Sequence, residues 1–249
     1  MQMDAQGEAI IEADGQLEAV ARELSIERGS GGAGPGGGGD ASDGAADDGE
    51  LAVTLRLSQV HAVDVEELWR ALTSPDRLAQ WLHPVSGELC EGGRFEVESA
   101  ASGVVEACRP PRSPQDSGEL QVTWEFGEDV ARVTVRCEPV EQAEATAAAR
   151  LVLEHHDRCP EFFWREYGPG AAGVGWDLTL LGLAHHLRAG CSRPVEESAW
   201  VTTPEAREFI TGASIRWAAA SVAVGTEEGQ ARAAEARATA FYTEPQSGE

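Results

Sequence analysis

The sequence predicts an α+β fold in which a curved antiparallel sheet wraps around one long helix, with further helices after it. The first observation is a series of short runs that alternate apolar with polar side chains. In residues 120–126, Leu, Val, Trp and Phe alternate with Gln, Thr and Glu, which is typical of a strand with one buried face. The second is the stretch from Trp176 to Leu187, where apolar residues recur at spacings of four, three and four. That spacing indicates the buried stripe of a helix.

The individual elements follow from local signals. A first strand is predicted at residues 53–58. Asp64 and Glu67 then have the spacing of a capping box, which predicts a helix start. Ser74 and Pro75 restart a second short helix that ends near Trp81, since Ser is a good cap and Pro suits the first turn. The later strands are predicted at residues 95–99, 104–109, 120–126, 130–137 and 150–156.

Connections and later helices are also marked in the sequence. Residues 110–118 are polar and contain Pro, which predicts a loop. Residues 141–149 are rich in Ala and Glu but lie where a hairpin loop is expected, so their conformation stays open. Gly173 and Gly182 lie within the long helix and predict close approach of a neighbouring group. Two further helices are predicted, one from Thr203 and one from residue 226.

The composition divides the chain into four parts. Residues 29–50 are mostly Gly, Ala, Asp and Ser, which buries too little apolar area to offset chain entropy. Residues 1–28 hold a weak apolar pattern that fits a docked hairpin, a docked helix or a loose segment. The predicted parts are an N-terminal extension (1–28), a flexible acidic Gly-rich linker (29–50), the main domain (51–189) and a C-terminal helical extension (190–249).

The charge excludes some classes of partner. The formal net charge is −24, and all 19 basic residues are Arg. Because nucleic acids and anionic membranes are bound by clusters of basic residues, neither is an expected partner. The five cysteines are scattered and odd in number, which favours free thiols in a reducing compartment. Without a basic, apolar leader or a membrane-length apolar stretch, the chain is expected to be cytoplasmic.

Several segments in succession resemble one protein superfamily. They are Trp69-Arg70-Ala71-Leu72-Thr73-Ser74-Pro75 with Leu78 and Trp81, Gly92-Gly93-Arg94-Phe95, Gly103-Val104-Val105-Glu106, residues 120–126, Leu151-Val152-Leu153-Glu154-His155, and Gly175-Trp176. In this order they resemble the SRPBCC (START-like) superfamily, and within it a bacterial branch named after the activator of the heat-shock chaperone ATPase. The resemblance implies a helix-grip fold over residues 51–189. Members include carriers of apolar small molecules, aromatic polyketide cyclases and chaperone regulators, so the resemblance leaves function open.

The leading hypothesis is a lipophilic ligand bound between the sheet and the helix at residues 176–187. Large apolar side chains on the inner face would contact the ligand, and His155 would fix its orientation. Such side chains line apolar pockets but equally fill cores, and sequence does not separate the two. The predicted ligand-binding residues are Trp81, Phe95, Trp124, Phe126, Leu153, His155, Phe163, Trp176 and Leu180.

Two alternatives remain at this point. The chain would be a cyclase or dehydratase of polyketide-like substrates if His155 and Glu106 faced one cavity as acid and base. Alternatively, it would be an interaction protein of the chaperone-activator kind. A buried His is more often a core residue bonded to its surroundings. No cofactor is predicted, and no metal site either, because the adjacent His155 and His156 point to opposite faces of a strand. Oligomeric state, including a homodimer, stays open.

Overall fold

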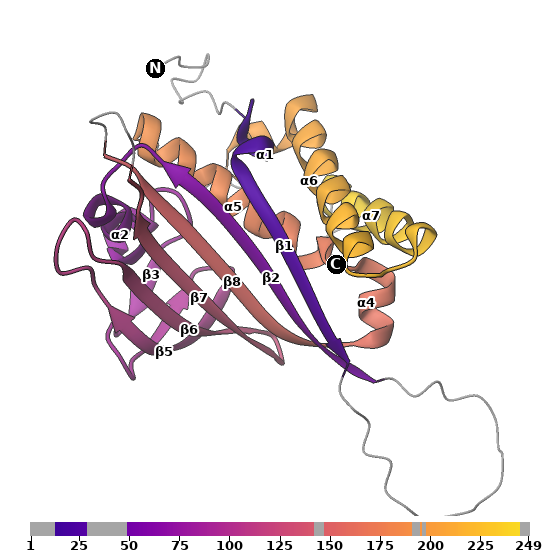
Figure 1. Cartoon of the computed structure of the whole chain (residues 1–249), viewed down its shortest axis with the longest axis horizontal. Coiled ribbons are helices and arrows are strands. Elements are labelled where there is room, and N and C mark those ends of the chain that lie inside the picture. The colour runs from indigo at the N-terminus through magenta and orange to yellow at the C-terminus, as the bar shows by residue number, and fades with distance from the viewer. Residues whose placement is uncertain (1–12, 29–48, 142–146, 191–194, 196–197, 245–249) are drawn as a thin grey trace, which may run out of the picture.

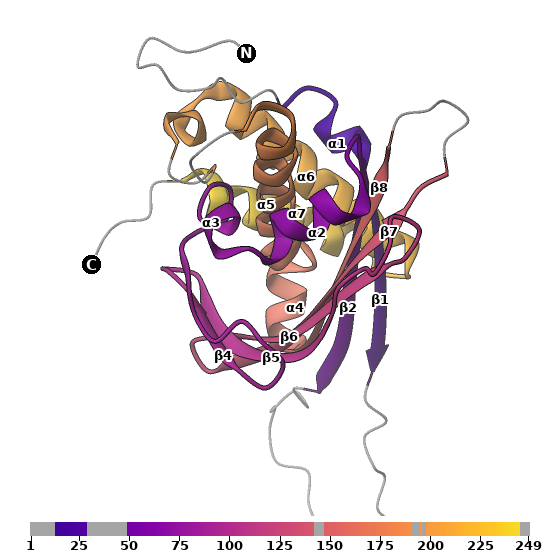
Figure 2. The same ribbon diagram turned by 90° about the vertical axis from the view of Figure 1, so that its left-hand side faces the viewer.

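A computed structural model describes residues 13–28, 49–141, 147–190, 195 and 198–244 of the chain. Its centre is an eight-stranded antiparallel sheet with strand order β1-β2-β8-β7-β6-β5-β4-β3. The sheet curves around one long helix and remains open between β1 and β3 (Figures 1 and 2). The predicted α+β class is confirmed. The strands are β1 (Val20–Arg28), β2 (Glu50–His61), β3 (Val85–Gly87), β4 (Arg94–Val97), β5 (Ala101–Arg109), β6 (Gly118–Phe126), β7 (Asp129–Pro139) and β8 (Ala149–Pro160).

The N-terminal extension contributes a full strand to this sheet. After the short helix α1 (Gln16–Ala19), β1 pairs with β2 over its whole length, from Val20 opposite Gln59 to Arg28 opposite Leu51. The sequence had left this segment open because its apolar side chains are sparse among charged ones. Pairing with β2 gives this segment its backbone hydrogen-bond partners, and it buries the side chains of Val20 and Leu24 against the core. Residues 20–28 and the main domain therefore form one sheet.

The short helices after β2 begin where predicted. In α2 (Val65–Thr73), the Asp64 carboxylate accepts a hydrogen bond from the Glu67 backbone N–H at 2.7 Å. The Glu67 carboxylate instead accepts from Arg77 at 2.7 Å, which ties α2 to α3 (Pro75–Leu78). The α2 helix contacts β7 and β8, and α3 contacts β3. Together these helices cover one end of the concave face of the sheet (Figure 2).

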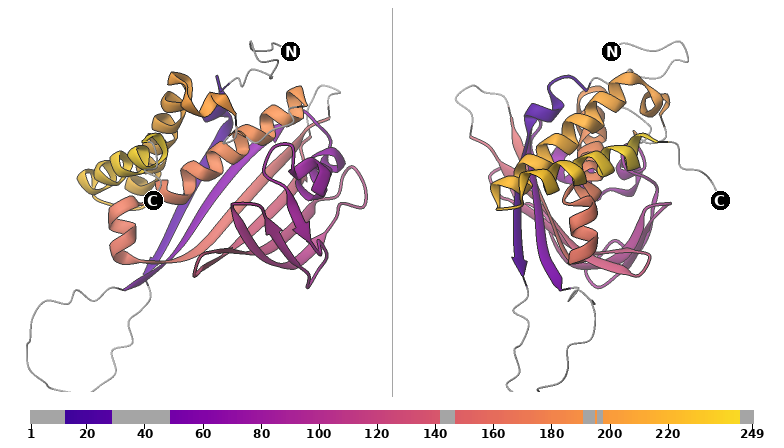
Figure 3. Two further views of the ribbon diagram at one scale, coloured as in Figure 1. Left: turned by 180° about the vertical axis from the view of Figure 1, so that it is seen from behind. Right: turned by 90° about the vertical axis from the view of Figure 1, so that its right-hand side faces the viewer.

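The C-terminal part of the chain is helical, as predicted. The helices are α4 (Glu161–Tyr167), α5 (Gly170–Ala189), α6 (Pro204–Ala223) and α7 (Glu228–Thr243), with a 3₁₀ turn, η2 (Ala199–Thr202), before α6. The α5 helix crosses the concave face, and α6 and α7 lie beside it on the side away from β3–β5 (Figure 3). None of the helices among the described residues has the length and apolar character needed to cross a membrane. Residues 142–146, within the segment of open conformation, lie outside the described residues.

Two of the predicted close approaches occur along α5. A Cβ atom at Gly182 would lie 2.8 Å from the backbone oxygen of Trp81, so glycine lets the chain after α3 rest on α5. A Cβ atom at Gly173 would lie 2.4 Å from a ring atom of Trp217 on α6. A Cβ atom does not come this close to a non-bonded heavy atom. The two glycines therefore set how closely both neighbours pack on this helix.

Asp177 joins three parts of the chain at one buried point of α5. Its carboxylate accepts hydrogen bonds from Arg22 of β1 at 2.6 and 3.0 Å, and from the indole N–H of Trp217 at 2.9 Å. The side chains of Arg22 and Asp177 are only 5% and 0% exposed. A buried charge pair of this kind is tolerated when additional hydrogen bonds satisfy it. An ion pair thus joins the N-terminal strand to the central helix, and a hydrogen bond to the same carboxylate joins the C-terminal extension to both.

We expect Asp177→Asn to lower the free energy of unfolding by about 3–5 kcal/mol, because it leaves the Arg22 guanidinium buried without a counter-charge. Urea unfolding followed by circular dichroism measures the loss. The matched control is Glu23→Gln, which breaks the exposed ion pair between Glu23 and Arg56 on the neighbouring strand. This control is expected to cost less than about 1 kcal/mol. Equal losses in the two variants would show that the buried pair is not the anchor.

Candidate functional site

An apolar cavity of about 130 Å³ lies between the concave face of the sheet, α5 and the α2–α3 segment. Strands β4–β8 form its floor and α5 one of its walls. Leu82, Val85 and Leu89 are partly exposed and form a rim after α3. Six of the nine predicted ligand-binding residues line this cavity: Trp81, Phe95, Trp124, Leu153, Trp176 and Leu180.

Strand alternation explains most of the floor. On β6, Val122 and Trp124 face the cavity while Gln121 and Thr123 do not. On β5, Val105 and Cys108 both face it although they are three residues apart. Strict alternation would place Val105 and Cys108 on opposite faces of the strand. The pairing of β5 with β6 shifts register between Val105 and Ala107, and such a bulge adds the residue that returns Cys108 to the inner face.

Phe126 and Phe163 do not line the cavity, which corrects the prediction for these two residues. Phe126 has the strand parity of Trp124, but it is the last residue of β6 and is 67% exposed. Phe163 is 40% exposed on α4, with its ring 5.1 Å from that of Tyr167. Parity along a strand identifies the face on which a side chain lies. It does not show where the covering helices end.

His155 lies on the inner face but behind the cavity wall. It is 7% exposed, and its Nδ1 accepts a hydrogen bond of 3.0 Å from the indole N–H of Trp176. Burial, with a smaller effect from His156, lowers the pKa of His155 to about 4. The ring is therefore neutral at pH 7, and its proton lies on Nε2 because Nδ1 is the acceptor. His155 is not among the residues that line the cavity.

Glu106 lies on the opposite, convex face of the sheet. Its carboxylate accepts hydrogen bonds from the Arg132 guanidinium at 2.5 and 3.0 Å. These hydrogen bonds hold the pKa of Glu106 below its usual value. Strict alternation would place Glu106 on the same face as Cys108, but the register shift between Val105 and Ala107 puts them on different faces. His155 and Glu106 are on different faces and cannot act as an acid–base pair on one substrate.

Polar groups are few among the described residues that line the cavity. The hydroxyls of Thr73 and Thr179 donate to the carbonyl oxygens of Trp69 and Gly175 within their own helices. The thiol of Cys108 has a raised pKa because it is partly buried. These groups leave no charge facing the cavity. The geometry is suited to holding apolar surface, and none of the described lining residues is an activated nucleophile.

Apart from Trp81, sequence reasoning missed the part of the wall that comes from the α2–α3 segment and its following turn. Leu72, Leu78, Leu82, Val85 and Leu89 all line the cavity. Leu78 and Leu82 are four residues apart and flank Trp81, so their spacing was a usable signal of one face. Val85 and Leu89 lie in or beside the three-residue strand β3, which is too short for its alternation to be recognised.

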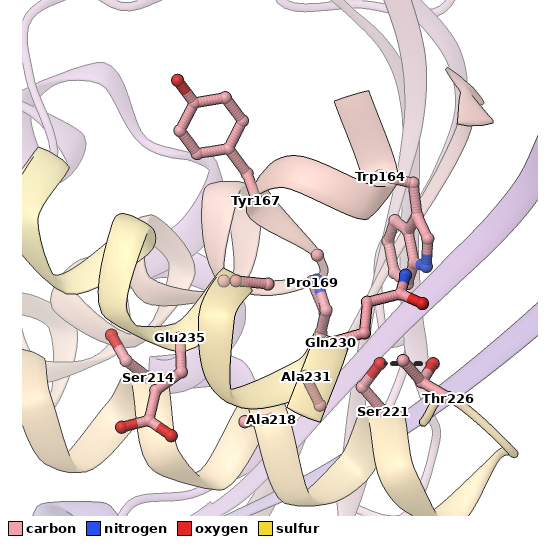
Figure 4. A pocket seen from close by; sticks show the side chains of 13 residues that line it. Trp164, Tyr167, Pro169, Ser214, Ala218, Ser221, Thr226, Gln230, Ala231 and Glu235 are labelled. Carbon is pink, nitrogen blue, oxygen red and sulfur yellow. Dashed lines mark hydrogen bonds between the residues drawn. The ribbon is translucent and has the colours of Figure 1, made fainter. Parts of the chain in front are cut away.

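Two other hollows differ in character. A pocket between α4, α5, α6 and α7 has a volume of only about 10 Å³, enough for one water molecule (Figure 4). Ser221 and Thr226 hydrogen-bond to each other at its edge. A larger, more polar hollow of about 330 Å³ is lined by Gln16, Gln59 and His61, among others. Neither hollow contains any of the predicted ligand-binding residues.

The family model described as "Activator of Hsp90 ATPase homolog 1-like protein" matches residues 62–188, half of the chain. The chain belongs to this family. The matched segment runs from the end of β2 to the end of α5 and so includes every element that lines the apolar cavity. No curated protein matches the chain.

Among solved structures, CalU16 from Micromonospora echinospora is similar over most of the chain. Its solution structure is 25% identical with a TM-score of 0.55, and the match covers 82% of this chain and 97% of CalU16. Its crystal structure is 24% identical with a TM-score of 0.50, and that match covers 80% of this chain and 98% of CalU16. The Aha1 dimer from Colwellia psychrerythraea is 15% identical over 55% of this chain and 97% of its own, with a TM-score of 0.40. The match with CalU16 thus extends well beyond the half of the chain matched by the family model.

Protonation of buried histidines should make the protein acid-sensitive. Burial lowers the pKa values of His155 and His61 from 6.5 to about 4. Between those values the unfolded chain binds more protons than the native one, so the free energy of unfolding falls as the pH falls. For His155→Gln, which does not titrate, we expect the loss between pH 7 and pH 4 to be smaller by on the order of 3 kcal/mol. Urea unfolding at several pH values measures both slopes, and identical slopes would contradict the assignment.

Proposed function

We propose that the protein binds a lipophilic small molecule in the apolar cavity between the sheet and α5. The observation that carries this proposal is the lining itself, which is formed by aliphatic and aromatic side chains together with two threonines and one cysteine. Burying a ligand's apolar surface against such walls is favourable by about 25 cal/mol per Å². A charged ligand would lose its hydration without gaining a counter-charge. The proposed ligand is therefore uncharged where it enters the cavity.

The cavity volume limits what fits without rearrangement. An engineered apolar cavity of about 150 Å³ stays dry and binds benzene. The volume of about 130 Å³ found here is of that order. It is suited to one or two fused aromatic rings or a short acyl segment. A longer ligand would extend over the rim formed by Leu82, Val85 and Leu89.

Binding is favoured over catalysis by the positions of the two candidate catalytic groups. His155 is not among the residues that line the cavity, and its Nδ1 accepts the hydrogen bond from the indole of Trp176. Glu106 is paired with Arg132 on the other face. A role as chaperone activator rests on the family description alone. No contact among the described residues favours that role, so we do not adopt it.

Paired native and denaturing mass spectrometry of protein purified from its own host tests the proposal directly. A mass retained under native conditions and lost on denaturation would identify an occupied cavity and give the ligand's formula. Folded protein that carries no such mass and binds none of a panel of small aromatic probes would contradict the proposal.

We expect Val122→Phe to weaken naphthalene binding by at least about tenfold, because the added ring occupies the space that the probe needs. Intrinsic naphthalene fluorescence measures the affinity. The matched control is Gln121→Phe, which adds the same ring one residue earlier on β6 but toward the convex face. This control is expected to bind as the wild type does. Equal weakening in both variants would place the probe elsewhere.

A further inference from the structure

The orientation of Trp176 depends on one hydrogen bond. An indole has a single donor and no acceptor, and a partly buried N–H usually finds a partner. Here the partner is Nδ1 of His155 at 3.0 Å, with the two rings in an edge-on arrangement 5.9 Å apart. His155 is itself fixed on β8, where it lies opposite Leu55 of β2 and Val133 of β7. The strand β8 therefore fixes the position of Nδ1 of His155, and the hydrogen bond to Nδ1 fixes the orientation of the Trp176 indole on α5.

Trp176 in turn packs directly against Trp124. Their ring centroids are 5.3 Å apart with an angle of 54° between the planes, and both side chains line the cavity. His155 contacts Trp176 and has no part in the lining. The two indoles thus form one continuous part of the cavity wall, and His155 bonds to one of them without lining the cavity. An indole is larger than a benzene ring, so a rotation of Trp176 would change a cavity of about 130 Å³ substantially.

We propose that His155 is a positioning residue that sets the size of ligand the cavity accepts, by holding Trp176 against Trp124 as part of its wall. This inference rests on the proposed function. It assigns His155 a role different from direct contact with the ligand, because His155 does not line the cavity. Removing the acceptor would free the indole to rotate and would lengthen the cavity toward β8. Ligands too long for the wild type would then bind.

Two substitutions separate the hydrogen bond from the bulk of the side chain. His155→Gln retains an acceptor, whereas His155→Leu fills the site with apolar atoms and removes it. The first readout is hydrogen exchange of the Trp176 indole N–H by NMR, with the resonance assigned from Trp176→Phe. We expect about tenfold faster exchange in His155→Leu, the effect of losing a hydrogen bond of ordinary strength. His155→Gln should restore slow exchange.

The second readout is the ratio of the dissociation constants for pyrene and naphthalene. The wild type and His155→Gln should bind naphthalene much more tightly than pyrene, and His155→Leu should reduce that ratio by about tenfold. An unchanged exchange rate in His155→Leu would overturn the positioning role. Faster exchange with an unchanged ratio would overturn the size limit. Wild-type protein that binds neither probe would instead overturn the proposed function, and the size limit with it.

Discussion

The buried pair of Arg22 and Asp177 is the interaction on which the arrangement of the whole molecule depends. Removing both charges from water is costly, and the cost is offset only where the remaining hydrogen-bonding capacity is used. Arg22 uses it on backbone carbonyls of residues 17 and 20, and Asp177 on the indole of Trp217. The pair therefore requires β1, α5 and α6 to be in place together. Because Trp176 directly precedes Asp177, the same pair also fixes the part of α5 that forms the cavity wall.

The two faces of the sheet have opposite chemistry, and this contrast is what permits an apolar cavity in so acidic a chain. Along the convex face, the ion pairs of Arg56 with Glu23 and Glu154, and of Arg136 with Glu154, cross four strands from β1 to β7. The adjacent histidines of β8 show the same division. His156 forms a hydrogen bond with the Thr54 hydroxyl on the convex face. His155 is buried on the other face, where it accepts a hydrogen bond from Trp176. Alternation directs most strand charges outward, and the inward Arg22 is paired with Asp177, so the part of the concave face that lines the cavity carries no charge.

Membership of the Hsp90-activator-like family places the cavity within a shared domain. The contacts that hold α5 in place come partly from elements outside that domain. Residues 62–188 include every element of the cavity but neither β1 nor α6. The extended match with CalU16 indicates that elements outside this segment also occur together with the domain in another protein. In physical terms, the extensions cover the outer side of α5 and stabilise the helix against which a ligand would be held.

Local sequence determined the strands from residue 51 onward except β3, and the helix starts at Asp64, Ser74 and Thr203. It also determined the inner face of the strands outside the β5 bulge, and six of the cavity residues. These features depend on periodicity and capping, which act over a few residues. The tertiary structure decided the pairing of β1 with β2 and the exposure of Phe126. It also decided the bulge that separates Glu106 from Cys108 and the partner of His155. Each of these depends on contacts between segments far apart in the chain. A periodic pattern identifies a side to be buried, but not the group that will cover it or the point at which that cover ends.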